Sequence, residues 1–164
     1  MQVREATVED MEAVTAIYGF SVRNETASFE LEPPDVATMT DRWQSTRDAG
    51  YPYLVACDDA GCVIGYAYAS AYRPRAAYAG SVENSVYVSP DHRRKGVARR
   101  LLEGLIAACQ TCGYRQMIAV ISDPRNSGSI GLHKALGFRS VGTLTGVGRK
   151  FDEWIDVVLM QKVL

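Results

Sequence analysis

The stretch that most constrains the fold is residues 92–106, HRRKGVARRLLEGLI, where five basic residues surround a glycine and an apolar stripe follows. The stripe recurs at helical spacing and predicts an amphipathic helix from about Gly96 to Cys112. The VYV segment before it is typical of a strand, which Pro90 ends. The first amides of a helix lack internal partners and lie at the positive end of its dipole. We therefore expect a phosphate site here, with Gly96 letting the backbone come close and Arg93, Arg94 and Lys95 attracting the anion.

This positive charge is local, because the whole chain carries 18 Lys+Arg against 19 Asp+Glu and has a net charge of -1. Nucleic-acid binding relies on an excess of Lys and Arg, so nucleic acid is not the expected partner. The first residues carry acids and no apolar segment, and no run approaches the roughly 20 apolar residues of a membrane span. We expect a single domain over residues 1–164, in the cytoplasm, with no membrane partner.

The order of predicted elements is β-α-α-β-β-β-α-β-α-β-β, a mixed α/β arrangement. A helical crossover after the fourth strand implies that part of the sheet is parallel. The helices are expected from a capping box at Thr7 and Asp10, from a cap at Asp35, from Gly96, and before Gly137. The strands are expected at residues 2–6, 53–57, 63–72, 85–89, 117–121, 141–144 and 154–160.

The four cysteines include a CxxC pair, Cys109 and Cys112, which could indicate redox or zinc chemistry. The pair ends a predicted helix rather than preceding one, and Cys57 and Cys62 flank a predicted hairpin turn. We interpret all four as reduced, small hydrophobic residues and expect no metal site. A thiol-redox role is the weakest alternative.

The basic stretch contains neither GxxxxGK[ST] nor GxGxxG. Its Arg93-x-x-Gly96-x-Ala98 pattern instead resembles the (Q/R)xxGx(G/A) segment of the GNAT family of N-acetyltransferases, whose loop holds the pyrophosphate of acetyl-CoA. Asn126 before the next helix, and Gly137-Phe138 after it, are similar to a second family stretch, and the element order is similar over nearly the whole chain. The resemblance implies the GNAT acyl-CoA N-acyltransferase fold, with a central mixed β-sheet flanked by helices. It also implies acetyl-CoA as co-substrate, held by Arg93, Arg94, Lys95, Gly96, Val97 and Ala98.

Three segments, TASFELEP, VENSVYVSPDHRRKGVA and GRKFDEWIDVVLMQ, are similar to the branch that acetylates phosphinothricin and methionine sulfoximine. This resemblance implies a small-molecule amine as acceptor. It also implies a homodimer, whose shared surface we expect near residues 150–158.

Acetyl transfer to an amine requires a base, donors for the oxyanion, and a proton for the leaving sulfur. Glu83 matches the glutamate that this branch uses as base, and we expect it just before the strand that lines acetyl-CoA, with a raised pKa. The resemblance implies a bulged strand that frees backbone amides, so Val86, Tyr87 or Val88 would bond the pantetheine arm and the thioester carbonyl. Asn126 would contact the pantetheine amides. His133 stands where the family often has a proton-donating tyrosine, and it is either that donor or a packing residue.

The acceptor site is expected to include Arg73 and Arg75, whose spacing places both guanidiniums on one side of an extended segment. Guanidinium forks match carboxylate and phosphinate oxygens. Tyr78 is close in sequence, and Phe29 and Glu30 match the other wall of the pocket in the resembling enzymes.

These patterns predict an acetyl-CoA-dependent N-acetyltransferase for the α-amino group of phosphinothricin, methionine sulfoximine or methionine sulfone. One alternative keeps the chemistry and changes the acceptor to a polyamine, an aminoglycoside or a protein N-terminus. The paired arginines argue against a polycation. The other alternative is a non-catalytic acyl-CoA sensor, which would have no need for a base at Glu83.

Overall fold

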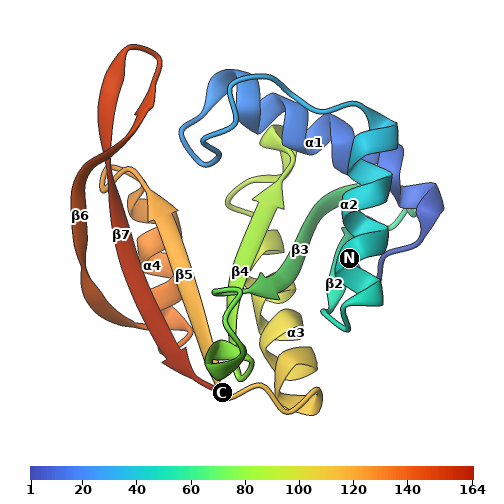
Figure 1. Cartoon of the computed structure of the whole chain (residues 1–164). Helices are drawn as coiled ribbons and strands as arrows, with labels where there is room; N and C mark the ends of the chain where they lie inside the picture. Colours follow the sequence, from blue (N-terminus) through green and yellow to red (C-terminus); the bar gives the residue numbers. More distant parts are fainter.

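A computed structural model describes all 164 residues of the chain. Figure 1 shows a twisted sheet with helices on both faces. The four α-helices are α1 Met11–Asn24, α2 Val36–Asp48, α3 Val97–Thr111 and α4 Ser127–Ala135. Short 3-10 turns lie at η1 Val8–Asp10, η2 Ala76–Tyr78 and η3 Pro90–His92. The strands are β1 Gln2–Glu5, β2 Tyr53–Cys57, β3 Val63–Ala71, β4 Ser81–Val88, β5 Gln116–Ser122, β6 Arg139–Lys150 and β7 Glu153–Val163.

The element order is the predicted one, and the predicted α/β class with a mixed sheet is confirmed. The seven strands lie in the order β1-β2-β3-β4-β5-β7-β6. Only β4 and β5 pair in parallel, and α3 connects them, as the crossover rule requires. All other neighbours are antiparallel.

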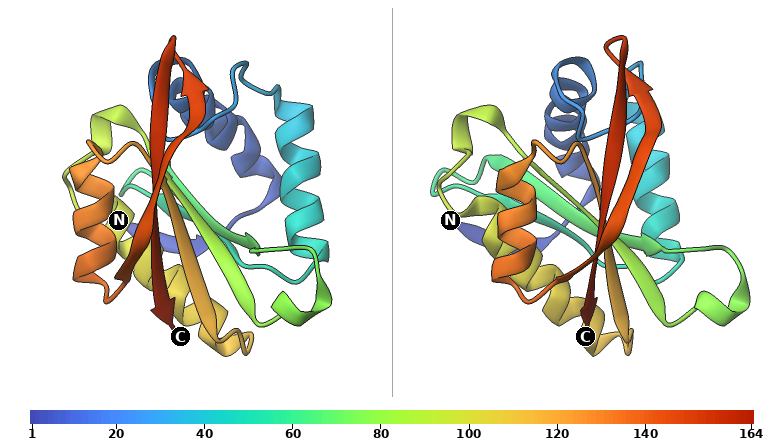
Figure 2. Two further views of the ribbon diagram at one scale, coloured as in Figure 1. Left: turned by 60° about the vertical axis from the view of Figure 1, so that its left-hand side comes forward. Right: turned by 90° about the vertical axis from the view of Figure 1, so that its left-hand side faces the viewer.

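Two apolar clusters fill the two sides of the sheet, because strand side chains alternate between its faces. In β2, Leu54 and Ala56 face the cluster with α3, whereas Val55 and Cys57 face the cluster with α1 and α2. Figure 2 shows α1 and α2 together on one side and α3 and α4 on the other. Each helix therefore buries the apolar stripe that its sequence period predicts.

Helix ends agree with the predicted caps. The Asp35 carboxylate accepts from the backbone N–H of Thr38 at 2.8 Å, and the Thr7–Asp10 capping box is present. None of the helices is both long and apolar enough to cross a bilayer.

Three strand predictions are wrong in extent. β4 begins at Ser81 rather than Ser85, and β6 and β7 run over 12 and 11 residues rather than the short stretches predicted. The glycines and exposed polar residues of β6 hide its strand pattern, because β6 is the edge strand and nearly all of it is exposed. The pairing of β6 with β7 stabilises the full length of this strand, which the sequence of β6 does not predict.

The cysteines are all free: Cys57 and Cys109 are buried, whereas Cys62 and Cys112 are exposed. Burial raises the pKa of the Cys109 thiol to about 12. No group of three or more His, Cys, Asp or Glu residues has the arrangement of a metal site.

Candidate active site

A cleft of about 1020 Å³ opens where β4 and β5 separate. Figure 1 shows these two strands diverging. The two strands pair only from Ser81 to Asn84 on β4 and from Gln116 to Ala119 on β5. Beyond this point β4 stays with β3, and β5 stays with β7. The cleft therefore lies between the part of β4 after Asn84 and the part of β5 after Ala119, which do not pair with each other.

The free amides of β4 face this cleft without any bulge. β4 pairs with β3 in continuous register from Val82 to Val88, so the implied bulge is absent. Hydrogen bonds of Ser81 and Ser89 with β3 show that odd-numbered residues of β4 bond that strand. The amides of Val86 and Val88 consequently point toward the cleft, whereas the Tyr87 amide faces β3. Of the three backbone amides predicted to face the cofactor, those of Val86 and Val88 therefore face the cleft, because successive amides of a strand point to opposite sides.

The start of α3 forms one end of the cleft. Gly96 is its N-cap with a left-handed φ of 80°, and Arg94 has a φ of 57°. The left-handed φ favours glycine here, and a Cβ at Gly96 would meet no protein atom within 4 Å. The N–H groups of Val97 and Ala98 have no helical partner and are available to an anion.

The basic side chains of this loop have different partners. Arg93 forms an ion pair with Glu25 at 2.5 Å, and its guanidinium lies over the ring of Phe20. Lys95 donates to the carbonyl oxygen of Asp91 at 2.8 Å and does not line the cleft. Arg93 and Arg94 do line it, together with Gly96, Val97 and Ala98. The loop therefore offers backbone amides and two arginines to a pyrophosphate.

Glu83 lies inside β4 rather than before it, and its side chain lines the cleft. Strand alternation places it on the same face as Tyr87, which packs edge-on against Tyr18. Burial raises the pKa of Glu83 above its usual value, and the charge of Arg73 partly opposes that rise. A carboxylate with a raised pKa binds a proton more strongly and is suited to act as a base.

His133 also lines the cleft but is only 2 % exposed. Its Nε2 lies 3.1 Å from Oδ1 of Asn84, and its Nδ1 lies 2.8 Å from the carbonyl oxygen of Ser129. Burial lowers the pKa of the ring below its usual value, which favours the neutral form. Each ring nitrogen thus lies next to a protein oxygen, and the single N–H of the neutral ring donates to one of the two.

Asn84 was not predicted from the sequence as a site residue. Its side-chain amide donates to the carbonyl oxygen of Ile118 at 3.1 Å, at the point where β4 and β5 stop pairing. No sequence signal indicates this role, because it depends on which residue stands at the strand separation. Asn126, the predicted pantetheine contact, caps α4 by accepting from the N–H of Ser129 at 3.2 Å and also lines the cleft.

The segment between α1 and α2 forms the wall opposite β5. Phe29 lines the cleft, whereas Glu30 does not. The carboxylate of Glu30 accepts from the Tyr18 hydroxyl at 2.9 Å and from Arg42 of α2 at 2.6 Å. Burial raises the pKa of Tyr18 to about 12, so its hydroxyl remains a donor. Helical spacing marks Tyr18 only as a core residue, and nothing in the sequence marks Arg42.

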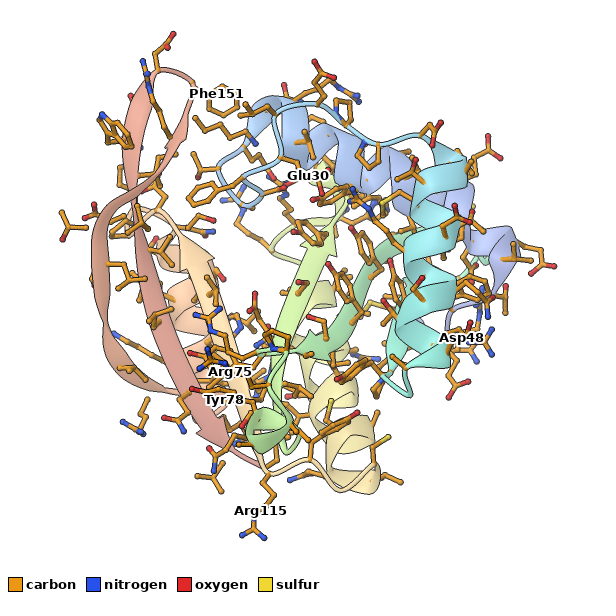
Figure 3. All side chains as sticks on the ribbon, in the orientation of Figure 1. Glu30, Asp48, Arg75, Tyr78, Arg115 and Phe151 are labelled. Carbon is orange, nitrogen blue, oxygen red and sulfur yellow. The ribbon has the colours of Figure 1, made fainter.

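The segment with Arg73 and Arg75 is not extended, and this premise of the prediction is wrong. It bends after β3 and enters the η2 turn Ala76–Tyr78, so the alternation of a strand does not apply. The guanidinium of Arg73 stacks over the ring of Tyr72 and is close enough to Glu83 to affect its pKa. Arg73, Arg75 and Tyr78 are all exposed, and none of them lines the cleft. Arg75 and Tyr78 lie at the opposite end of the sheet from Glu30 and Phe151 (Figure 3).

Comparisons with known proteins agree with this geometry. Residues 3–159 match the model of the acetyltransferase (GNAT) domain. The chain is 51% identical over 162 residues to a phosphinothricin N-acetyltransferase of Alcaligenes faecalis, covering 99% of this chain and 82% of the relative. It is 42% identical over 159 residues to an L-methionine sulfoximine/L-methionine sulfone acetyltransferase of Pseudomonas paraeruginosa, covering 97% and 92%.

A solved structure gives the same fold. The crystal structure of a GNAT superfamily phosphinothricin acetyltransferase from Sinorhizobium meliloti, in complex with AcCoA, matches with a TM-score of 0.96 and 45% identity. The match covers 99% of this chain and 88% of that one. The unpaired amides of β4 and the start of α3 thus suit the acetyl-CoA that the sequence predicts as co-substrate.

Proposed function

The chain belongs to the GNAT family of acetyltransferases, and from that premise we propose that it transfers acetyl from acetyl-CoA to the α-amino group of a small amino-acid analogue. Phosphinothricin, methionine sulfoximine and methionine sulfone are the proposed acceptors, since relatives at 51% and 42% identity carry these compounds in their names. A cytoplasmic location fits an enzyme that uses acetyl-CoA.

The observation that carries this proposal is Glu83 within the cleft, where burial raises its pKa and the charge of Arg73 partly opposes that rise. An amino acid arrives as an ammonium and must lose a proton before its nitrogen can attack. Glu83 accepts that proton, directly or through water, while Arg73 attracts the acceptor's carboxylate. An α-amino acid acceptor needs a base for its ammonium group and a cation for its carboxylate, and Glu83 and Arg73 are the proposed pair.

The transfer is a direct attack. The nitrogen forms a bond to the thioester carbon, and the N–H groups of Val86 and Val88 are positioned to donate to the developing oxyanion or to the pantetheine arm. The attached nitrogen, now cationic, loses its second proton to water, and the carbonyl re-forms as the carbon–sulfur bond breaks and releases CoA as a thiolate. We propose that this thiolate takes its proton from water, and that His133 positions Asn84, because each ring nitrogen of His133 lies next to a protein oxygen.

The charges near Glu83 argue against a polyamine. Arg73 is close enough to Glu83 for its charge to oppose the rise in that carboxyl's pKa, and the carboxylate of Glu30 is paired with Arg42. A polycation would meet this positive charge and would find Glu83 as the one cleft carboxylate outside an ion pair, since Glu25, Asp123 and Glu153 are paired with arginines. Arg75 and Tyr78 do not line the cleft of their own chain. Their role in binding the acceptor therefore stays a prediction.

A homodimer is the proposed assembly. β6 is an exposed edge strand with apolar side chains at Val141, Leu144 and Val147, each about half exposed. In the segment expected to form the shared surface, residues 150–158, Phe151 and Trp154 are exposed as well. Long apolar edges are usually covered in native proteins, and a second copy of this chain is the proposed cover.

The test is CoA release from acetyl-CoA with methionine sulfoximine, phosphinothricin or spermidine, using wild type and Glu83→Gln. Isothermal titration with acetyl-CoA measures cofactor binding separately. Turnover of the first two acceptors, lost in Glu83→Gln with acetyl-CoA binding intact, is the expected result. Turnover of spermidine alone would overturn the acceptor class but not the chemistry. Binding without turnover of any amine would support the sensor instead.

A further inference from the structure

Lys150 is a buried cation that the proposed reaction does not use. It lies at the end of β6, is only 3% exposed, and donates from Nζ to the carbonyl oxygens of Glu25 at 2.7 Å and Ser28 at 2.6 Å. A buried ammonium is tolerated only when it is well hydrogen bonded. These two bonds therefore connect the β6–β7 hairpin to a segment more than 120 residues earlier.

A second contact joins the same two segments. Gly148 and Lys150 share one face of β6, since side chains alternate along a strand, and both are buried there. A Cβ at Gly148 would overlap the ring of Phe29. The Phe29 ring thus lies directly on the Gly148 backbone, two residues from the Lys150 bonds. Figures 1 and 2 show the tip of the hairpin beside the end of α1 and the segment that follows it.

The segment between α1 and α2 that Lys150 contacts depends on contacts with other parts of the chain for its position. Residues 25–35 contain no helix or strand, so their backbone is not fixed by regular hydrogen bonds. The Ser28 hydroxyl bonds to Tyr18 at 2.8 Å, which fixes one side chain. Lys150 fixes two backbone carbonyls, those of Glu25 and Ser28, immediately before the Phe29 wall of the cleft.

We propose that Lys150 is a positioning residue that fixes the Phe29 wall of the acceptor site and thereby sets the affinity for a small acceptor. Nζ holds the backbone, and Gly148 provides the flat surface on which Phe29 rests. Lys150 does not line the cleft, so it acts through this wall rather than by touching the acceptor. The acceptor in this inference is that of the proposed function, on which the inference rests.

The test replaces Lys150 with Met, which keeps most of the side-chain volume and removes the donors. Arg149→Met is the matched control, because Arg149 is the exposed neighbour on the same strand. Hydrogen exchange of peptides spanning residues 24–31 is measured without ligand, followed by KM for acceptor and for acetyl-CoA. Lys150→Met should speed exchange in these peptides and raise the acceptor KM about tenfold, since displacing a binding wall by about 1 Å has large effects. KM for acetyl-CoA should change less than about twofold, and Arg149→Met should behave as wild type.

Unchanged exchange and unchanged acceptor KM in Lys150→Met would overturn the inference. If Lys150→Met does not fold, Gly148→Ala is the second variant, because its methyl group displaces Phe29 while Lys150 remains. A Gly148→Ala protein with wild-type acceptor KM and exchange would contradict the proposed wall. The exchange measurement needs no acceptor, so it tests the Lys150 contact even if none of the proposed amines is turned over.

Discussion

The Nε2 atom of His133 lies 3.1 Å from Oδ1 of Asn84, while its Nδ1 lies 2.8 Å from the carbonyl oxygen of Ser129. The Asn84 amide group donates to Ile118, so its oxygen is the atom that faces the ring. A neutral imidazole has one N–H and donates to only one of these oxygens. This pair connects α4 to β4 at the point where the sheet opens.

The first prediction concerns the pH dependence of the reaction. If His133 positions Asn84, His133→Gln should keep the shape of the pH profile of kcat, because its amide can still donate to Asn84. His133→Leu should lower the free energy of unfolding by about 1–3 kcal/mol, since it leaves a buried oxygen unpaired. Kinetics from pH 5 to 10 and urea unfolding measure these effects. Loss of the same limb of the profile in both variants would instead identify His133 as the proton donor.

His133 also predicts how stability varies with pH. Burial lowers its pKa in the folded protein, so below its usual value of about 6.5 the unfolded chain binds the proton more readily. The stabilising contribution is present above pH of about 6.5 and is lost as pH falls toward the folded pKa. The difference in unfolding free energy between wild type and His133→Gln should therefore shrink between pH 7 and 5. A constant difference in urea titrations would contradict this.

The next prediction concerns the acid limb of the pH–activity profile, which we expect Glu83 and Arg73 to control. Glu83 must be ionised to accept a proton, and burial raises its pKa while Arg73 opposes that rise. Activity should therefore increase with pH through a value above about 4.3, the usual glutamate pKa. Arg73→Met should move that limb to higher pH and raise the acceptor KM, whereas Arg75→Met should leave the limb in place. An unmoved limb in Arg73→Met would show that another group controls it.

We expect the ion pair of Glu25 and Arg93 to compete with binding of acetyl-CoA. Arg93 lines the cleft at the expected pyrophosphate position, and its partner carboxylate lies 2.5 Å away. Both side chains are partly exposed, so the pair is worth at most about 1 kcal/mol. Glu25→Gln should therefore tighten acetyl-CoA binding up to about fivefold. The difference in Kd between wild type and variant should become smaller above about 0.5 M salt, because salt screens the ion pair. Titration calorimetry measures this Kd, and Glu12→Gln is the control, at the start of the helix that Glu25 caps. Weaker binding by Glu25→Gln would mean that the pair positions Arg93 for the cofactor.

The exposed edge of β6 predicts the effect of a charge on assembly. Leu144→Lys places a cation on the proposed dimer surface and should convert the dimer to the 18.0 kDa monomer in light scattering. Val8→Lys is the matched control, because Val8 is similarly exposed but lies on η1, far along the chain from the hairpin. A wild-type chain that is already monomeric would contradict the proposed assembly.

The sequence alone determined the features that short stretches encode. The apolar period of α3, the start of that helix at Gly96 and the caps at Asp35 and Thr7 depend on neighbouring residues, and each lies where it was predicted. The order of elements and the expectation that part of the sheet is parallel follow from the same local patterns. The family resemblance then indicated the chemistry, including Glu83.

Tertiary structure alone decided how remote segments meet. Glu83 lies within β4 because β3 and β5 extend that strand by pairing with it, which its own residues do not predict. The free amides of β4 come from the separation of two strands, and no local pattern records where neighbours stop pairing. Likewise, the contacts between Lys150 and Glu25, between Glu30 and Arg42, and between His133 and Asn84 join distant positions. Periodicity and turn chemistry act over a few residues, whereas the site is assembled from side chains that only the complete sheet brings together.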